Sequence, residues 1–339
     1  MRRSPTIIDV ASHAGVSKST VSNVLQGKSN VDATIRERVL QAISDLGYQA
    51  NAGARSMRQR PKVLGIVVGD LTNPYHAELA AHIERYAAKR MHSILLVSTG
   101  GLPDAESKRV RTLIEHRVAA VLFLSSPESE TLRMIGADLP KVFVGLTMPG
   151  QNSVSVNDYL GAQLAVRHLT ALGHREIGFV SAMLADEPRI EEVRFQGFSS
   201  GMAEAGLRLC ETHLLREKGR ALGDGDYQDL IMRLLAREGR PTAIVAALDR
   251  IALEVISAAD RLGIQIPNEL SLIGFDDIAI SGHSRIALTT IAQPMEELAR
   301  LAVDMAVDGI SIDGNGMRLA EVMLPPRLIE RHTTGRCKD

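Results

Sequence analysis

The chain has 339 residues, a formal net charge of −1 and 45% hydrophobic residues. This length predicts two or three domains, and the composition is that of a soluble globular protein that should fold without a partner. No apolar run reaches the roughly 18 residues of a membrane span, and residues 6–15 are too polar for the core of a signal peptide. Cys210 and Cys337 lie far apart in the chain. We therefore expect reduced thiols in a cytoplasmic protein without a metal or cofactor.

The charge is distributed unevenly along the chain. Residues 1–62 contain ten Lys and Arg against four acids, a balance of +6, which leaves −7 for the remainder. A basic head on an acidic body predicts that only the head contacts a polyanion. A basic face that is merely solvated fits the composition equally well.

The head begins with the pattern of two short helices joined by a tight turn. Thr6 is a good N-cap with Asp9 three residues later. Apolar residues then recur at helical spacing as far as Gly15, where the helix is expected to end. Ser17 is placed to cap a second helix, and Asp32 is placed to cap a third that ends at Gly47. The pattern predicts a helix-turn-helix within a three-helix bundle.

The exposed face of the second helix is rich in hydrogen-bonding groups of modest length. It presents Lys18, Ser19, Ser22 and Asn23. Such side chains suit base edges and phosphates in the DNA major groove, whereas a solvated helix more often has Glu and Lys pairs.

Residues after Pro61 predict an α/β body. Val63–Val68 is a continuous apolar run of the kind found in buried parallel strands, and a helical pattern follows at 76–90. Further strand-like runs lie at 93–98, 118–124, 141–146, 176–181, 242–248 and 271–275. Their alternation with helices predicts two doubly wound subdomains, in which ligands bind at the carboxyl ends of strands.

An enzyme is not expected. Asp276 and Asp277 are adjacent carboxylates at a strand end, so their side chains should point to opposite faces. No nucleophile elbow, phosphate-binding loop or metal-spaced histidine cluster is found in the sequence.

Several motifs together resemble the lactose-repressor/galactose-repressor (LacI/GalR) family. In the head these are residues 6–11, 14–17 and 20–22, followed by Gly47-Tyr48, Asn51 and residues 54–57. In the body they are residues 73–75, 172–178, 194–198, 271–277, 288–291 and 326–331. The resemblance spans residues 6–331. It implies a small all-α helix-turn-helix head and a periplasmic-binding-protein-like α/β body.

The resemblance also implies domain boundaries. The DNA-binding domain would take residues 1–50, a hinge 51–61, the effector-binding and dimerisation body 62–331, and a tail 332–339. Within the body, the N-lobe would comprise about 62–158 and 293–320, and the C-lobe about 162–289 and 321–331.

DNA-contacting positions carry over from the family motif by residue. Lys18, Ser19 and Asn23 match positions that select the bases. The other matches, at the backbone, site edge and hinge, are Thr6, Ser17, Ser22, Asn30, Tyr48 and Arg55. Met57 stands where the family has a Leu that wedges into the minor groove. Ile35 stands where the family usually has Thr, so that a phosphate contact is lost there unless Thr34 replaces it.

Effector-binding positions are implied in the same way. They are Asn73, Tyr75, His76, Arg189, Arg194, Leu248 and Asp276. Two departures bear on the ligand, because Gly145 replaces a frequent Asp and Leu248 replaces a frequent Asn. Both lose a polar group, which predicts a ligand with fewer hydroxyls or greater bulk, and an acidic ligand held by Arg194 stays open.

The expected function is that of a sequence-specific DNA-binding transcription regulator, most simply a repressor of carbohydrate or related metabolite genes. A homodimer would bind pseudo-palindromic operator DNA in the bacterial cytoplasm, associated with the nucleoid, under control of a sugar, sugar acid or related effector. The residues after Arg331 contain no leucine heptad, so tetramers are not expected. One alternative is a body that binds a protein or nothing. A solute-binding receptor is another, but it would require a signal peptide and would lack the basic head.

Overall fold

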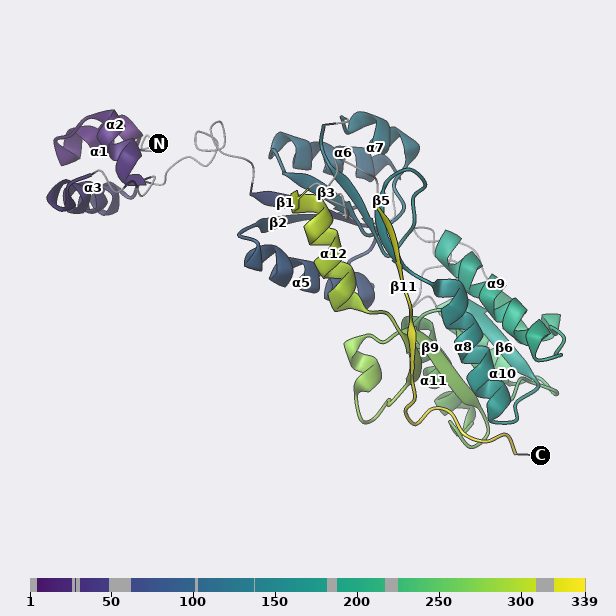
Figure 1. Cartoon of the computed structure of the whole chain (residues 1–339). Helices are drawn as coiled ribbons and strands as arrows, with labels where there is room; N and C mark the ends of the chain where they lie inside the picture. The colour runs from purple at the N-terminus through teal and green to yellow at the C-terminus, as the bar shows by residue number, and fades with distance from the viewer. Residues whose placement is uncertain are drawn as a thin grey trace. The chain divides into compact units, whose positions relative to one another are not determined.

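The computed structural model describes residues 5–25, 28, 31–48, 62–100, 103–136, 138–181, 188–216, 225–308 and 320–338. The chain forms two compact units, which meet in sequence at Pro61 and Lys62 (Figure 1). Over the described ranges, no helix is long and apolar enough to cross a membrane.

The head is a bundle of the three predicted helices, α1 (Ile7–Ala14), α2 (Lys18–Leu25) and α3 (Ala33–Leu46). Its centre is formed by Val10, Val21 and Val39, one from each helix and all fully buried. The capping box predicted at the start of α1 is confirmed, because the Thr6 and Asp9 side chains each accept from the other's backbone amide.

Glycine ends both α1 and α3, as predicted. Gly15 and Gly47 have φ angles of 64° and 60°, a left-handed conformation that glycine adopts without strain. Gly15 is also needed for space, since a Cβ there would lie 2.8 Å from Nη2 of Arg38. That guanidinium donates to the Ala14 carbonyl at 2.7 Å and so ties α3 to the end of α1.

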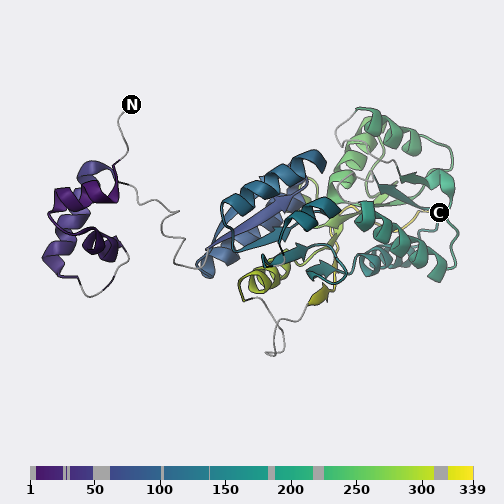
Figure 2. The ribbon, with the colours of Figure 1, turned by 90° about the horizontal axis from the view of Figure 1, so that it is seen from above.

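The body contains two six-stranded sheets in separate lobes (Figures 1 and 2). The first has the order β11-β5-β4-β3-β1-β2 and is parallel throughout. Its strands are β1 (Val63–Val68), β2 (Ser93–Ser98), β3 (Ala120–Phe123), β4 (Lys141–Val144), β5 (Asn152–Val156) and β11 (Glu321–Leu324). Its helices are α5 (Pro74–Lys89), α6 (Pro103–Glu115), α7 (Ser129–Met134) and α12 (Met295–Asp308).

Strand β1 shows why this sheet is covered on both faces. Leu64 and Ile66 belong to the apolar cluster that includes α5 and α12, whereas Val67 belongs to the cluster that includes α6. Successive side chains of a strand point to opposite faces, so a continuous apolar run requires helices on both.

The second sheet has the order β12-β10-β9-β8-β6-β7, with β12 antiparallel to β10. Its strands are β6 (Ile177–Ser181), β7 (Leu214–Arg216), β8 (Ala243–Ala246), β9 (Ser271–Asp276), β10 (Thr289–Ala292) and β12 (Arg327–Ile329). The lobe also contains α8 (Asp158–Ala171), α9 (Pro188–Glu204), η1 (Glu211–His213), α10 (Gly225–Leu235), α11 (Asp249–Leu262) and η2 (Ala279–Gly282).

The chain crosses between the lobes three times, and the last crossing corrects a predicted boundary. The resemblance implies that residues 321–331 belong to the C-lobe, but β11 pairs in parallel with β5 of the first sheet. The register aligns Glu321 with Ser153 and Leu324 with Val156. The crossing therefore lies at Pro325-Pro326, where two prolines without amide protons separate the two sheets.

Candidate DNA interface and effector site

The candidate DNA-reading surface is the solvent side of α2. Val21 and Val24 are buried in the head core, while Lys18 and Ser19 on the other side are exposed. Ser22 and Asn23 are half-buried. The helix therefore buries its apolar side chains and exposes Lys18, its single cation, at its N-terminal end.

Two of the predicted DNA residues use their hydroxyls within the head. The Ser17 hydroxyl accepts from the Thr20 amide at 3.1 Å, which makes it the cap of α2. The Thr6 hydroxyl donates to Asp9 at 2.7 Å. Tyr48 and Ile35 are both half-buried against the head core. Packing thus explains why an apolar residue stands at position 35. The hydroxyl of the neighbouring Thr34 donates to Asp32. Asn30, Arg55 and Met57 lie outside the described residues.

In the body, Arg194 on α9 is the centre of a buried polar cluster. Its side chain is 3% exposed. Nε donates to Asp158 at 2.8 Å, Nη1 donates to the Ala247 carbonyl at 2.7 Å, and Nη2 lies 3.3 Å from Asp276. The guanidinium also lies 3.7 Å above the ring of Phe275. Stacking and directed hydrogen bonds fix the plane of the guanidinium.

Gln293 continues this cluster into the first lobe. Its amide nitrogen donates to Asp276 at 2.7 Å, and its oxygen accepts from the Tyr75 hydroxyl at 2.9 Å. Sequence reasoning missed Gln293, although it follows β10, and the preference of ligands for the carboxyl ends of strands could have identified it. A continuous polar chain thus joins α9 in one lobe to α5 in the other.

Asn73 and His76 hold the turn that presents Tyr75. The Asn73 side-chain oxygen accepts from the Tyr75 amide at 3.2 Å and caps α5, with Pro74 in the first turn. His76 is fully buried, and its Nδ1 donates to the Asp70 carbonyl at 3.0 Å. These two hydrogen bonds therefore position the backbone of the turn.

The two departures at Gly145 and Leu248 have structural reasons. Gly145 has a φ of 82°, and a Cβ there would lie 3.1 Å from the Tyr75 hydroxyl oxygen. Tyr75 therefore occupies the space that a side chain at position 145 would need. Leu248 is 4% exposed and packs in the core of the second lobe. Neither position offers a polar side chain to a ligand.

Asp276 and Asp277 do not act as a pair. Asp276 faces Gln293 and Arg194, whereas Asp277 pairs with Arg331 at 2.6 Å. Their separation confirms the prediction that adjacent carboxylates at this strand end diverge. Arg189 lies in α9, but its side chain is outside the described part of the structure. Where the chain is described, no group of His, Cys, Asp and Glu could hold a metal ion.

The main site groups lie where ligands enter α/β sheets. Asp276 ends β9, Gln293 follows β10, and Ala247 follows β8 in the second lobe. Tyr75 and Gly145 follow β1 and β4 in the first. Carboxyl ends of strands in both sheets thus contribute to one polar cluster.

Comparison with known proteins agrees with this two-part architecture. Residues 6–51 match the profile of "Bacterial regulatory proteins, lacI family", and residues 166–334 match that of a periplasmic binding protein-like domain. The ribose operon repressor of Haemophilus influenzae is 31% identical, over 97% of this chain and 98% of that protein. Catabolite control protein A of Priestia megaterium is 30% identical, over 97% and 99%.

A solved structure extends the similarity to the whole molecule. The lac repressor dimer bound to operator and the anti-inducer ONPF has a TM-score of 0.82 and 26% identity, over 98% of this chain and 100% of that one. The structural match therefore covers nearly the full length of both chains. The chain belongs to the lacI family of bacterial regulatory proteins and is a DNA-binding transcription regulator.

Proposed function

We propose that this regulator represses genes for the use of a small uncharged polyhydroxyl compound, which binds between the lobes at Arg194, Asp276 and Gln293. The observation that supports it is the buried polar chain from Arg194 to Tyr75, which joins both lobes. A ligand that replaces part of this chain changes the contacts between the lobes. Differential affinity for two lobe arrangements is what an allosteric effector requires.

The charge of the cluster favours a neutral effector over a sugar acid. The Arg194 guanidinium lies between two carboxylates, 2.8 Å from Asp158 and 3.3 Å from Asp276. A ligand carboxylate that approached Asp276 would meet a like charge in a buried site. A hydroxyl can accept from Arg194 and donate to Asp276, so it meets both groups without adding charge.

The test is a thermal-shift and calorimetry screen of neutral sugars and nucleosides alongside the corresponding sugar acids. The proposal predicts stabilisation by a neutral compound, its loss in Arg194→Met, and retention in the matched control Arg216→Met. Arg216 also lies 3.7 Å above a phenylalanine ring, but its ion pair is with Glu192 and not with Asp158 or Asp276. Tight binding of a sugar acid, or unchanged binding by Arg194→Met, would contradict the proposal.

For DNA, we propose that a homodimer places one head on each half of a pseudo-palindromic operator. Lys18, Ser19 and Asn23 then read the major groove, and Met57 enters the minor groove at the centre. The dimeric lac repressor on operator supports this assembly. Within the body, edge strand β2 leaves Ile94, Leu95, Leu96 and Val97 only half-buried, which fits a surface covered by a second copy.

The proposal contains no catalytic step and places the protein with DNA in the cytoplasm. Family membership supports a regulator. A body that binds a protein partner is the second candidate. An absence of stabilisation by every compound in the screen would favour it.

A further inference from the structure

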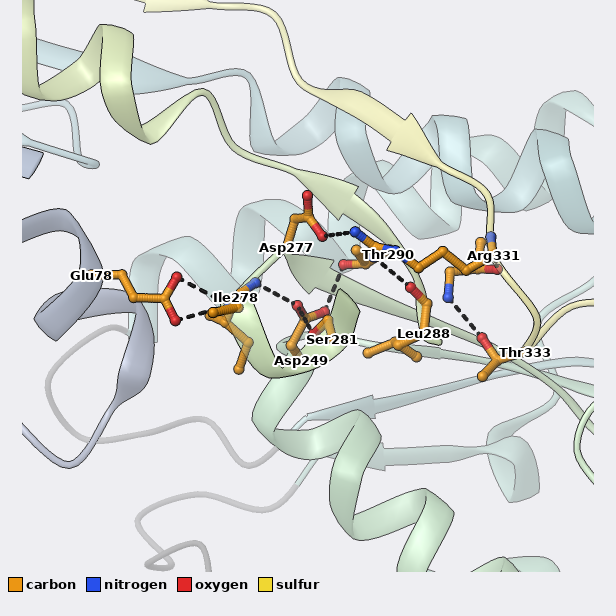
Figure 3. Close-up of polar contacts among 11 residues, drawn as sticks. Glu78, Asp249, Asp277, Ile278, Ser281, Leu288, Thr290, Arg331 and Thr333 are labelled. Carbon is orange, nitrogen blue, oxygen red and sulfur yellow. Dashed lines mark hydrogen bonds and ion pairs between the residues drawn. The ribbon is translucent and has the colours of Figure 1, made fainter. Parts of the chain in front are cut away.

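Asp249, the first residue of α11, lies outside the proposed effector contacts and is fully buried. Its carboxylate accepts from the Ile278 amide at 3.0 Å, the Ser281 hydroxyl at 2.7 Å and the Thr290 hydroxyl at 2.6 Å (Figure 3). Gly274 makes room for it, since a Cβ there would lie 2.1 Å from the carboxylate oxygen. Asp249 therefore fixes the short segment Ile278–Gly282 to the second lobe.

The same segment is held from the other side by the first lobe. Glu78 on α5 accepts from the Ala279 amide with both carboxylate oxygens, at 2.9 Å and 3.1 Å. Ile278 is 1% exposed and packs in the first-lobe cluster that contains Leu79 and Met295, although it follows a second-lobe strand. Figure 3 shows Glu78 approaching this segment from its own helix, opposite Asp249.

A second contact between the lobes starts from the next residue of α11. Arg250 pairs with Asp70, which follows β1, at 3.4 Å. Burial opposes ionisation of Asp70, but hydrogen bonds from Thr72 and the charge of Arg250 outweigh it and lower its pKa. The first two residues of α11 thus take part in both contacts between the lobes. Asp249 holds the segment Ile278–Gly282 that Glu78 contacts, and Arg250 pairs with Asp70 directly.

We propose that Asp249, the segment Ile278–Gly282 and Glu78 form an interlobe latch that favours the lobe arrangement seen here. Separation of α5 from this segment must break the Glu78 hydrogen bonds and withdraw Ile278 from the first-lobe core. Both events cost free energy, because they leave amide and apolar groups without their partners. The latch is distinct from the Arg194 cluster and acts without ligand or DNA.

The experiment measures the distance between the lobes in the free full-length protein. Spin labels are attached at Ala88→Cys on α5 and Arg261→Cys on α11, both exposed positions, after Cys210→Ser and Cys337→Ser remove the native thiols. Pulsed electron resonance then gives the distance distribution. The variants are Glu78→Ala and Ile278→Ala, and the matched control is Glu84→Ala, an exposed carboxylate on the same helix.

Each latch variant should raise the population of a second distance by roughly tenfold, the factor that corresponds to about 1.4 kcal/mol. Glu78→Gln retains one acceptor oxygen and should give a smaller increase, whereas Glu84→Ala should match the parent protein. If Ile278→Ala fails to fold, Glu78→Ala decides the result. Superimposable distributions for the parent and Glu78→Ala would overturn the latch and leave the effector proposal untouched.

Discussion

Single residues decide how closely the helices of the second lobe approach. Gly197 lies in α9, where a Cβ would be 2.2 Å from the Tyr159 carbonyl oxygen of α8. That oxygen is backbone and cannot move away alone, so any side chain forces the two helices apart. The sequence showed Gly197 only as part of a family motif, and the packing of α9 on α8 gives the physical reason for it.

Gly197→Ala should lower the free energy of unfolding by about 2 kcal/mol or more through overpacking. Gly136→Ala is the matched control, since nothing lies within 4 Å of its Cβ position, and its effect should stay within about 0.5 kcal/mol. Urea denaturation of the two variants measures the difference. Equal midpoints would show that α8 and α9 do not approach as described.

Asp249 should make stability depend on pH. Burial raises its pKa from 3.8 to about 6, although three hydrogen bonds oppose that rise. Between these two pKa values the Asp249 carboxyl is ionised in the unfolded chain and still protonated in the folded protein. Its contribution to the free energy of unfolding is therefore fully present below about pH 4. It is lost as the pH rises to about 6, and amounts in total to about 3 kcal/mol.

Asp249→Asn removes this titration while keeping the shape of the side chain. The stability of the variant relative to the parent should rise between pH 4 and 6 and become constant above that range. Denaturant unfolding at intervals of half a pH unit measures it. A difference that is flat across the range would show that Asp249 titrates normally in the folded protein.

The sequence pointed to some residues of the candidate site and missed others for physical reasons. Arg194, Tyr75 and Asp276 stand in recognisable motifs, and the structure brings all three into one cluster. Gln293 escaped because it lies in a crossing segment whose neighbours are distant in sequence. The resemblance implies an effector contact at Leu248, yet its burial in the core is a property of packing.

At the scale of elements, α2 is proposed to read bases through Lys18, Ser19 and Asn23. Ser19→Ala and Asn23→Ala should change which bases are preferred, because each removes a group proposed to reach base edges. Lys18→Ala should change the preference and also weaken binding by about tenfold, because it removes a cation from the DNA-facing surface. Gln41→Ala on α3, whose amide contacts Asp45 at 2.7 Å, is the control.

Selection of sequences from a random DNA library, performed with each full-length variant, measures the preference. Binding isotherms on the selected duplex measure the affinity. The assignment of α2 fails if Ser19→Ala and Asn23→Ala select the same sequence as the parent with the same affinity.

Elements were predictable where apolar residues formed long runs. The run at β1 is apolar throughout and was recognised, whereas β5 alternates apolar residues with Ser153 and Ser155, both buried. The Ser155 hydroxyl lies 2.9 Å from that of Thr147, so hydrogen bonding replaces apolar packing there. Short strands such as β7 and β12, with three residues each, lack a period that a pattern can detect.

At the scale of the whole molecule, pairing between distant segments set the limits of prediction. Strand β11 joins the first sheet beside β5, a partner more than 160 residues earlier in the sequence. The sequence does not reveal this distant pairing, so the predicted lobe for residues 321–324 is wrong. The division into a basic head and an α/β body was visible from charge and periodicity. The polar contacts between lobes were not, because each involves residues that only the fold brings together.

The central claim is that the full-length chain recognises a particular DNA sequence. The most direct measurement is the affinity of the purified protein for its selected duplex and for a shuffled duplex of equal composition, at one fixed salt concentration. Specific recognition predicts at least about a thousandfold tighter binding to the selected duplex. Equal affinity for both duplexes, with the same dependence on salt, would contradict the claim.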